Sequence, residues 1–429
     1  MRRRKEIVMA LEIVFECPRT LSRLSNGPLG KLVDGFLNWL LSHGYRRGTI
    51  RKHLFNVSHL NEHLGGPSSG FHESLSSRDV AGFLKAYPLL CQRQGAVQGR
   101  ARRVSYSINR FLDYLRESGL LDPSSGQQIY QPLMDAYLKW MRDYQHASEG
   151  TIGVRCHSIT QFLEWLGPEA VPEGLLRLNS DRIENFFISY AQSMGRSARR
   201  SMQSALRTFL RFCLHNGYIE QSLEYAVPTL RTYKLATVPR GLTDTQAQQV
   251  LRCIKRNSHV GRRDYAIVLL LYTYGVRGGQ VRALRLEDIN WEQNQILFKA
   301  LKHGKDSRLP LTPEVGESLL DYLQNSRPAY SYPHVFLTCR APYLPFPYSS
   351  SLSAVVERRI RDAGIEIPNR GAHAFRHCFA TRMLHKGHCL KEIADVLGHR
   401  HLGTTFIYTK VTFHALRQVA LEWPQEVLQ

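Results

Sequence analysis

The first half of the chain carries the same pattern of hydrophobic and polar positions twice. The segment LVDGFLNWL at residues 32–40 is echoed by LMDAYLKWM at residues 133–141. After each segment, apolar residues recur every three or four positions, which is the spacing of an amphipathic helix. The sequence therefore predicts two tandem helical modules of about a hundred residues each.

A Gly-Thr-Ile tripeptide follows each of these segments, at residues 48–50 and 150–152. A threonine hydroxyl can accept a hydrogen bond from an unpaired amide at a helix start, so Thr49 and Thr151 are predicted N-caps. Each module then ends in a further amphipathic pattern, SINRFLDYLRESGLL in the first copy and SALRTFLRFCLHNGYI in the second.

The pattern changes after residue 227. A stretch rich in proline, threonine and basic residues reads as a linker, and Thr243 with Gln246 forms a capping-box signature that opens a new domain. This domain alternates helical segments, such as DYAIVLLLYTYG and AFRHCFATRMLHKG, with a β-hairpin pattern, QILFKAL and SRLPLT around a KHGKD turn. The predicted fold class is mainly α with a small β component.

The predicted order along the chain is a basic N-terminal segment, two helical modules, a linker, a mixed α/β domain and a tail helix. Their boundaries are residues 1–25, 26–125, 126–227, 228–242, 243–412 and 413–429.

A formal net charge of +21 and a pI near 9.8 favour a polyanionic partner, most often nucleic acid. The last helix of the second module concentrates this charge, since four arginines at spacings of four, seven and four share one helical face. No acidic residue lies between Glu184 and Glu220. The sequence therefore predicts DNA-phosphate contacts from Arg196, Arg200, Arg207 and Arg211.

The remaining composition argues against several classes of protein. Eight cysteines are scattered singly with no CxxC pair, which indicates reduced thiols and no zinc module. No run approaches eighteen apolar residues, and Glu6 and Glu12 interrupt the apolar stretch behind the basic start. We therefore expect a cytoplasmic, nucleoid-associated protein with no membrane segment and no metal.

Three segments of the last domain carry candidate chemistry. In YGVRGGQVRALRLEDI, one helix ends at Gly275 and another begins near Gly279, so Arg277 sits where unpaired helix amides and a guanidinium can hold a phosphate. In HAFRH, His373 and Arg376 are three apart and neighbours on a helix. The polar run GHRHLGTTFIYTK is either a surface loop with a stray aromatic or a nucleophile, Tyr408, on a short element.

The order of these segments resembles the tyrosine recombinase (phage integrase) family. Six positions match that family in chain order across roughly residues 242–412, and LGHRHLGTTFIYTKV is close to its usual LGH…TT..YT.V segment. The Asp-x-Phe/Tyr-Leu-x-Trp…Thr-Ile pattern of each N-terminal module also resembles the core-binding domain of the family. Two such modules depart from its common single-copy layout.

The resemblance implies a role for each matching residue. Tyr408 would attack a DNA phosphate and form a 3′-phosphotyrosine. Arg277, Arg376 and His399 would stabilise the charge that builds on the phosphate oxygens, and His373 would act as the base. No metal, ATP or other cofactor is implied.

The acid that protonates the leaving 5′-oxygen is implied to be a lysine on the hairpin. Counting back eight from Pro310 matches that position to Lys302, with Lys299 and Lys305 as rivals because the hairpin register is easily misassigned.

The resemblance also implies partners: double-stranded DNA, a homo-tetramer acting on two DNA sites, and an accessory recombinase or DNA-bending protein as a further candidate. The reaction would be site-specific recombination for a mobile element. Gln280 replaces the usual acidic residue of the family, which gives less electrostatic support to a cationic site and leaves a catalytically weak DNA-binding helper as an alternative. A type IB topoisomerase shares the chemistry, and a structural nucleoid protein is a third alternative.

The first module could be a decayed duplicate, a protein-interaction domain or a second DNA clamp. Its basic residues flank the Gly-Thr-Ile turn and the start of its final helix, at places that match the basic positions of the second module. This placement favours the clamp. The residues are Arg46, Arg47, Arg51, Lys52, Arg100, Arg102, Arg103 and Arg110.

Overall fold

The computed structural model describes residues 11, 14–65, 75, 77–93, 100–120, 128–229, 241–301, 306–368, 370–398 and 405. Most of the predicted linker and the whole predicted tail helix lie outside these residues. The chain divides into two compact units, one of residues 1–37 and 51–233 and the other of residues 38–50 and 234–429. The finer division into two N-terminal modules stays a prediction.

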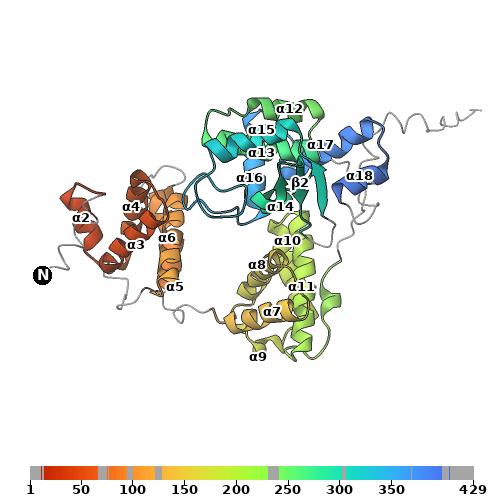
Figure 1. Ribbon diagram of the computed structural model, residues 1–429. Coiled ribbons are helices and arrows are strands. Elements are labelled where there is room, and N and C mark those ends of the chain that lie inside the picture. The colour runs from red at the N-terminus through yellow and green to blue at the C-terminus, as the bar shows by residue number, and fades with distance from the viewer. Residues whose placement is uncertain are drawn as a thin grey trace, which may run out of the picture. The chain divides into compact units, whose positions relative to one another are not determined.

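The helices of the N-terminal region come first along the chain (Figure 1): α2 (Pro18–Ser25), α3 (Gly30–Ser42), α4 (Arg47–Leu64), α5 (Ser77–Arg93) and α6 (Arg100–Glu117). They belong to the first unit except for the end of α3 and the start of α4, which fall in residues 38–50. The apolar face of α6 is buried at three- and four-residue spacings, including Val104, Ile108 and Phe111. Phe111 meets Phe36 of α3 edge to face, with ring centroids 5.1 Å apart. Burial of this face holds the helices together, because each is apolar on one side only.

The second set of helices in this unit is α7 (Gln131–Asp143), α8 (Glu149–Leu166), α9 (Pro172–Leu175), α10 (Ser180–Ser193) and α11 (Arg196–His215). Their core is rich in aromatic rings, and Phe209 of α11 lies edge to face with Tyr137 of α7 at 5.2 Å. The predicted cap at Thr151 is wrong. Ser148 is the N-cap of α8 and accepts from the Thr151 amide, because Glu149 and Gly150 already belong to the helix. Thr49 likewise lies inside α4.

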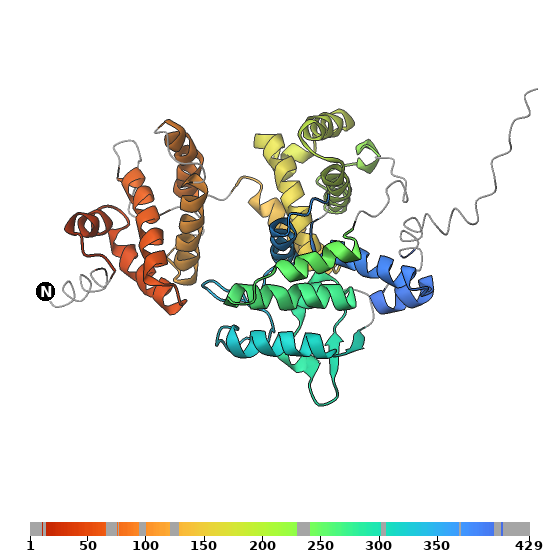
Figure 2. The same ribbon diagram turned by 90° about the horizontal axis from the view of Figure 1, so that it is seen from above.

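The second unit contains α12 (Asp244–Cys253), α13 (His259–Tyr274), α14 (Gly278–Ala283), α15 (Pro313–Asn325), α16 (Ser349–Asp362), α17 (Ala372–His385) and α18 (Leu390–Leu397). Helix α13 contacts α12, α15, α16 and α17 (Figure 2), so the run from Ile267 to Leu271 is almost wholly buried. The predicted capping box is confirmed, since the Thr243 hydroxyl accepts from the Gln246 amide and the Gln246 side chain accepts in return.

A buried ion network ties α13 to α16. Asp264 is fully buried and accepts from Arg263, Arg358 and Arg359 at 2.7, 2.9 and 2.6 Å. Because a buried carboxylate is stable only when it is paired, this network fixes α16 against the central helix.

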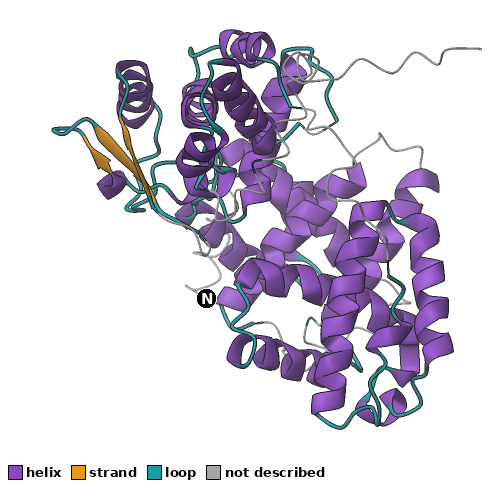
Figure 3. Cartoon of the chain, turned by 90° about the vertical axis from the view of Figure 1, so that its right-hand side faces the viewer, coloured by secondary structure: helices purple, strands orange, loops and turns teal. Residues whose placement is uncertain are grey.

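The predicted hairpin is confirmed as β2 (Gln295–Phe298) and β3 (Ser307–Pro310), which pair antiparallel with Ile296 opposite Leu309. Strand β1 (Ile289–Asn290) pairs with β2 on its other edge. Helices predominate over this small sheet among the described residues (Figure 3). The fold class is therefore mainly α with a small β component, as predicted.

Candidate active site

Arg277 stands at the junction between α13 and α14. Gly275 ends α13 in the left-handed conformation with φ of 60°, and Arg277 is the N-cap of α14. A Cβ at Gly275 would lie 2.5 Å from the Phe379 ring, so both the backbone conformation and the close packing require glycine here. The chain thus turns sharply enough to bring Arg277, half-buried, beside α17 and α18.

Arg376 lies on α17 and is 4% exposed. Its Nη1 donates to the Gly275 carbonyl at 2.9 Å and its Nη2 to the Leu397 carbonyl at 2.7 Å. The same helix buries Phe375 and Phe379 in the core. This packing sets the rotation of α17 and so the direction of the guanidinium.

The two arginines meet at the end of α18. Arg277 approaches the Leu397 and Gly398 carbonyls at 3.5 and 3.4 Å, and Gly398 ends the helix with φ of 62°. The last carbonyls of a helix lack intrahelical partners and carry the negative end of its dipole, so they favour cations. Two guanidiniums are therefore held immediately before residue 399.

His373 is exposed on α17, three residues before Arg376. Desolvation by the surrounding protein, followed by the charges of Arg376 and Arg277, lowers the pKa of His373. A lowered pKa keeps the imidazole neutral at neutral pH, where it can accept a proton.

A hollow of about 750 Å³ opens beside His373. It is lined by Glu357, Ile367, Pro368, Arg370, Gly371, His373 and His377. Sequence reasoning missed Arg370, a half-buried cation just before α17, because a single arginine in a loop has no distinguishing spacing. The structure makes it a candidate for binding an anionic group next to His373.

Lys302, His399 and Tyr408 lie outside the described residues. Among the rivals for the acid, Lys299 is described and its ammonium pairs with the Asp288 carboxylate at 2.7 Å. The hydrogen bond to Asp288 raises the pKa of Lys299, which makes it a poorer proton donor. This pairing weakens Lys299 as a candidate. Lys305, the other rival, lies outside the described residues like Lys302, so Lys302 stays a prediction.

Gln280 is buried behind Arg277. Its side-chain oxygen accepts from the Arg277 amide at 3.1 Å, and its nitrogen donates to the Lys299 carbonyl at 3.5 Å. The neutral amide therefore fixes the backbone that carries the arginine but adds no charge to the site.

The four arginines predicted to bind DNA lie on α11 but differ in their surroundings. Arg207 donates to the Val227 carbonyl at 2.9 Å, and Arg211 pairs with Glu224 at 2.7 Å. These two tie α11 to the segment that follows it. Arg196 and Arg200 are exposed near the start of the helix and stay predicted phosphate contacts.

No group of three or more His, Cys, Asp or Glu side chains that could hold a metal ion occurs within the described ranges. In the same part of the chain, no helix is both long and apolar enough to cross a membrane.

Residues 240–415 match the family model described as "Phage integrase family". The Sinorhizobium fredii protein named "Putative integrase/recombinase y4rA" is 32% identical over 415 residues, which cover 95% of this chain and 97% of that protein. "Tyrosine recombinase XerC" of Anoxybacillus flavithermus is 28% identical over 297 residues, covering 67% of this chain and 96% of its own length.

Two solved structures share the fold. The XerH site-specific recombinase bound to palindromic difH substrate, in a post-cleavage complex, has a TM-score of 0.51 at 20% identity and covers 68% of this chain and 85% of its own. A lambda integrase tetramer bound to a Holliday junction has a TM-score of 0.50 at 15% identity, and the match covers 72% of this chain and 87% of the lambda integrase chain.

Proposed function

Because the chain belongs to the phage integrase family of tyrosine recombinases, we propose that Tyr408 is the nucleophile with which it cleaves and rejoins DNA strands at a specific site. One observation carries the assignment of the site. Arg277 and Arg376, 99 residues apart in the sequence, both reach the carbonyl of Leu397, eleven residues before Tyr408. A phosphate bound by these guanidiniums would lie at the end of α18, which precedes Tyr408 in the sequence.

The chemistry follows from the groups present. The Tyr408 oxygen attacks phosphorus, a phosphotyrosine bond forms, and the bond to the 5′-oxygen breaks. His373 takes the phenolic proton, and Lys302 gives a proton to the departing 5′-oxygen. Arg277, Arg376 and His399 stabilise the negative charge on the non-bridging oxygens.

The reaction needs no metal ion and no ATP in this proposal. The guanidiniums supply the charge stabilisation that a divalent cation would otherwise give, and the phosphotyrosine bond conserves the energy needed for rejoining. The reverse attack by a 5′-hydroxyl then restores the DNA strand and frees Tyr408.

The proposed assembly is a homo-tetramer on two DNA sites, with DNA contacts from Arg196 and Arg200 of α11. The lambda integrase tetramer on a Holliday junction supports this assembly by its shared fold. An accessory recombinase or a DNA-bending protein is a further candidate partner, and recombination of a mobile element is the proposed setting. Cytoplasmic, nucleoid-associated localisation is part of the same proposal.

A nicked suicide substrate tests the assignment, because loss of a short strand next to the cut traps the covalent intermediate. We expect the full-length protein to form a protein–DNA adduct in the presence of EDTA and without ATP. Tyr408→Phe should form none, because it lacks the hydroxyl, while binding the same duplex normally. An adduct with Tyr408→Phe would place the nucleophile elsewhere, and binding without any wild-type adduct would favour the catalytically weak helper.

A further inference from the structure

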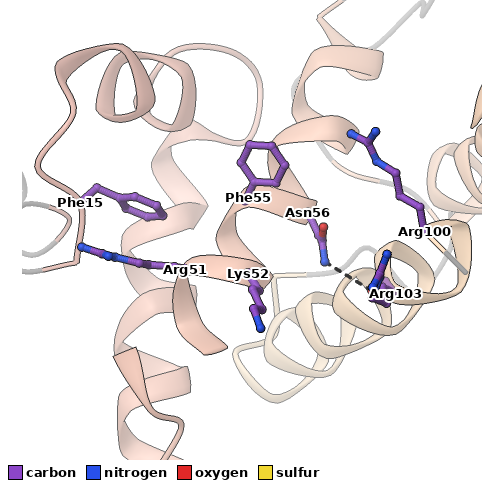
Figure 4. A pocket seen from close by; sticks show the side chains of 7 residues that line it. All are labelled: Phe15, Arg51, Lys52, Phe55, Asn56, Arg100 and Arg103. Atoms are coloured by element: carbon purple, nitrogen blue, oxygen red, sulfur yellow. Dashed lines mark hydrogen bonds between the residues drawn. The ribbon is translucent and has the colours of Figure 1, made fainter. Parts of the chain in front are cut away.

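A basic hollow with aromatic walls lies in the first unit, among residues of the N-terminal region. It has a volume of about 450 Å³ and is formed by side chains from the segment before α2, from α4 and from the first turn of α6 (Figure 4). It is lined by Phe15, Arg51, Lys52, Phe55, Asn56, Arg100 and Arg103. This volume falls within the range of roughly 300–1,000 Å³ that small-ligand sites occupy.

The charged side chains that line the hollow are all positive. Four of its seven lining residues are cationic and none is acidic. Arg51 donates to the Val14 carbonyl and lies 3.7 Å from the Glu16 carboxylate, so these contacts already neutralise part of its charge. Lys52, Arg100 and Arg103 have no carboxylate partner within the part of the chain that the structure describes. A bound phosphate would therefore meet cations that are not already neutralised.

The start of α6 adds to this field. Arg100 and Arg103 belong to its first turn, which carries no acidic residue. The positive end of the helix dipole lies at this turn and favours an anion. The hollow thus combines a helix start with side-chain cations, and it does not depend on the helix start alone.

The aromatic residues of the hollow indicate which kind of anionic ligand it can bind. Phe55 is 42% exposed although it is a large apolar ring, and Figure 4 shows the Phe15 ring beside Arg51. Arg51 lies over the Phe15 ring at 6.0 Å. Arg23 lies over the Phe55 ring at 5.1 Å, but Phe55 keeps 42% of its surface exposed. A regular duplex offers phosphates but keeps the faces of its bases stacked, so it would use the cations and not this exposed part of Phe55. An unpaired nucleotide offers both a phosphate and a free base face, and cations interleaved with aromatic rings are how proteins hold single strands.

We propose that this hollow binds an unpaired nucleotide of a DNA strand, with the phosphate on Lys52, Arg100 and Arg103 and the base stacked on Phe55. The choice of DNA over RNA rests on the proposed function. Asn56 also lines the hollow, and its side-chain nitrogen donates to Ser107 Oγ at 2.8 Å, which holds the amide in place.

The test compares binding of the full-length protein to a fluorescent twelve-nucleotide oligo-dT and to a duplex of unrelated sequence. Phe55→Ser should weaken oligo-dT binding about 5- to 150-fold, the range expected for loss of one base–aromatic stack. Duplex binding should change less than twofold. Tyr106→Ser is the matched control. Tyr106 is an aromatic residue of α6 that is also exposed (51%), but it does not line the hollow.

A second pair of variants isolates the cations. Arg100→Gln with Arg103→Gln should flatten the salt dependence of oligo-dT binding by about 1.4 in the log–log slope, since each lost contact to a single strand removes about 0.7. Arg102→Gln with Lys85→Gln removes the same charge from exposed positions outside the hollow and should change the slope less. Phe55→Trp keeps a stacking face and should bind at least as well as the wild type, which separates loss of stacking from loss of folding.

Photocrosslinking with 5-iodo-deoxyuridine in the oligonucleotide should join DNA to the peptide that contains Phe55.

Equal weakening of oligo-dT and duplex binding by Phe55→Ser would overturn the assignment to an unpaired nucleotide. Equal losses in the control variants would mean that binding does not depend on the hollow. Polyglutamate competing as well as oligo-dT would assign the hollow to acidic peptides. Adduct formation by the wild type on the suicide substrate is scored separately, so failure of the proposed function and failure of this inference are distinguishable.

Discussion

Replacing Arg376 by lysine should loosen the end of α18 as well as slow DNA cleavage. The arginine is 4% exposed and uses two different nitrogens to reach two carbonyls, those of Gly275 and Leu397. Lysine has a single nitrogen on a shorter reach, so at least one carbonyl loses its partner. Leaving one buried carbonyl without a partner costs about 1–3 kcal/mol.

Hydrogen exchange followed by mass spectrometry measures this cost in the intact chain. If the loss falls on local opening, amides of α18 should exchange about 5- to 150-fold faster in Arg376→Lys, because each 1.4 kcal/mol is about a factor of ten. Arg277→Lys is the matched control. Its guanidinium is half-buried and approaches the same region only at 3.4–3.5 Å, so exchange in α18 should change less than threefold.

Both variants should form the covalent DNA adduct about 10²- to 10³-fold more slowly, the usual cost of removing one donor that stabilises transition-state charge. The two measurements therefore separate anchoring from catalysis. Equal protection of α18 in the two variants would refute the reasoning, because it would mean that the two carbonyl contacts of Arg376 do not hold the helix end.

Three further outcomes follow from the same site and its support. Lys302→Ala should cleave a normal substrate slowly and be rescued by a 5′-bridging phosphorothiolate, whose leaving group needs no proton; the same rescue for Lys299→Ala would show that the hairpin register is wrong. The acidic limb of the cleavage rate against pH should lie below the ordinary imidazole value of 6.5, because the lowered pKa of His373 keeps it neutral until the pH falls further, and a limb above 6.5 would contradict this. Asp264→Ala should reduce the free energy of unfolding of the second unit by about 3–5 kcal/mol in urea titration, since three arginines lose a shared buried acceptor; a loss below 1 kcal/mol would count against the network.

Local features of the chain were predictable because they depend on neighbouring residues. The Thr243–Gln246 capping box, the antiparallel hairpin and the helix end at Gly275 all appear where the sequence places them. Each involves hydrogen bonds or steric limits within a few residues. The cap of α8 shows the limit of this reasoning, because two nearby hydroxyls compete and the structure selects Ser148 over Thr151.

The order of the candidate catalytic residues was also visible in the sequence, and it pointed to the family before any geometry was known. The place where Arg277 and Arg376 meet in space was not visible in the sequence. Arg376 reaches carbonyls 101 and 21 residues away along the chain, and backbone carbonyls carry no sequence signal. Only the packing of α13, α17 and α18 decides that the two arginines share Leu397.

Tertiary structure also decided what the basic residues of α11 contact within the protein. The sequence puts Arg196, Arg200, Arg207 and Arg211 on one face of a helix, yet two of them are bound within the protein. Arg211 pairs with Glu224, a residue beyond the acid-free stretch, and Arg207 holds the Val227 carbonyl. The hollow around Phe55 arises in the same way from three separated segments. Sequence fixes the charge of each position, but folding decides whether a carboxylate, a carbonyl or solvent lies beside it, and that neighbour determines what the charge can bind.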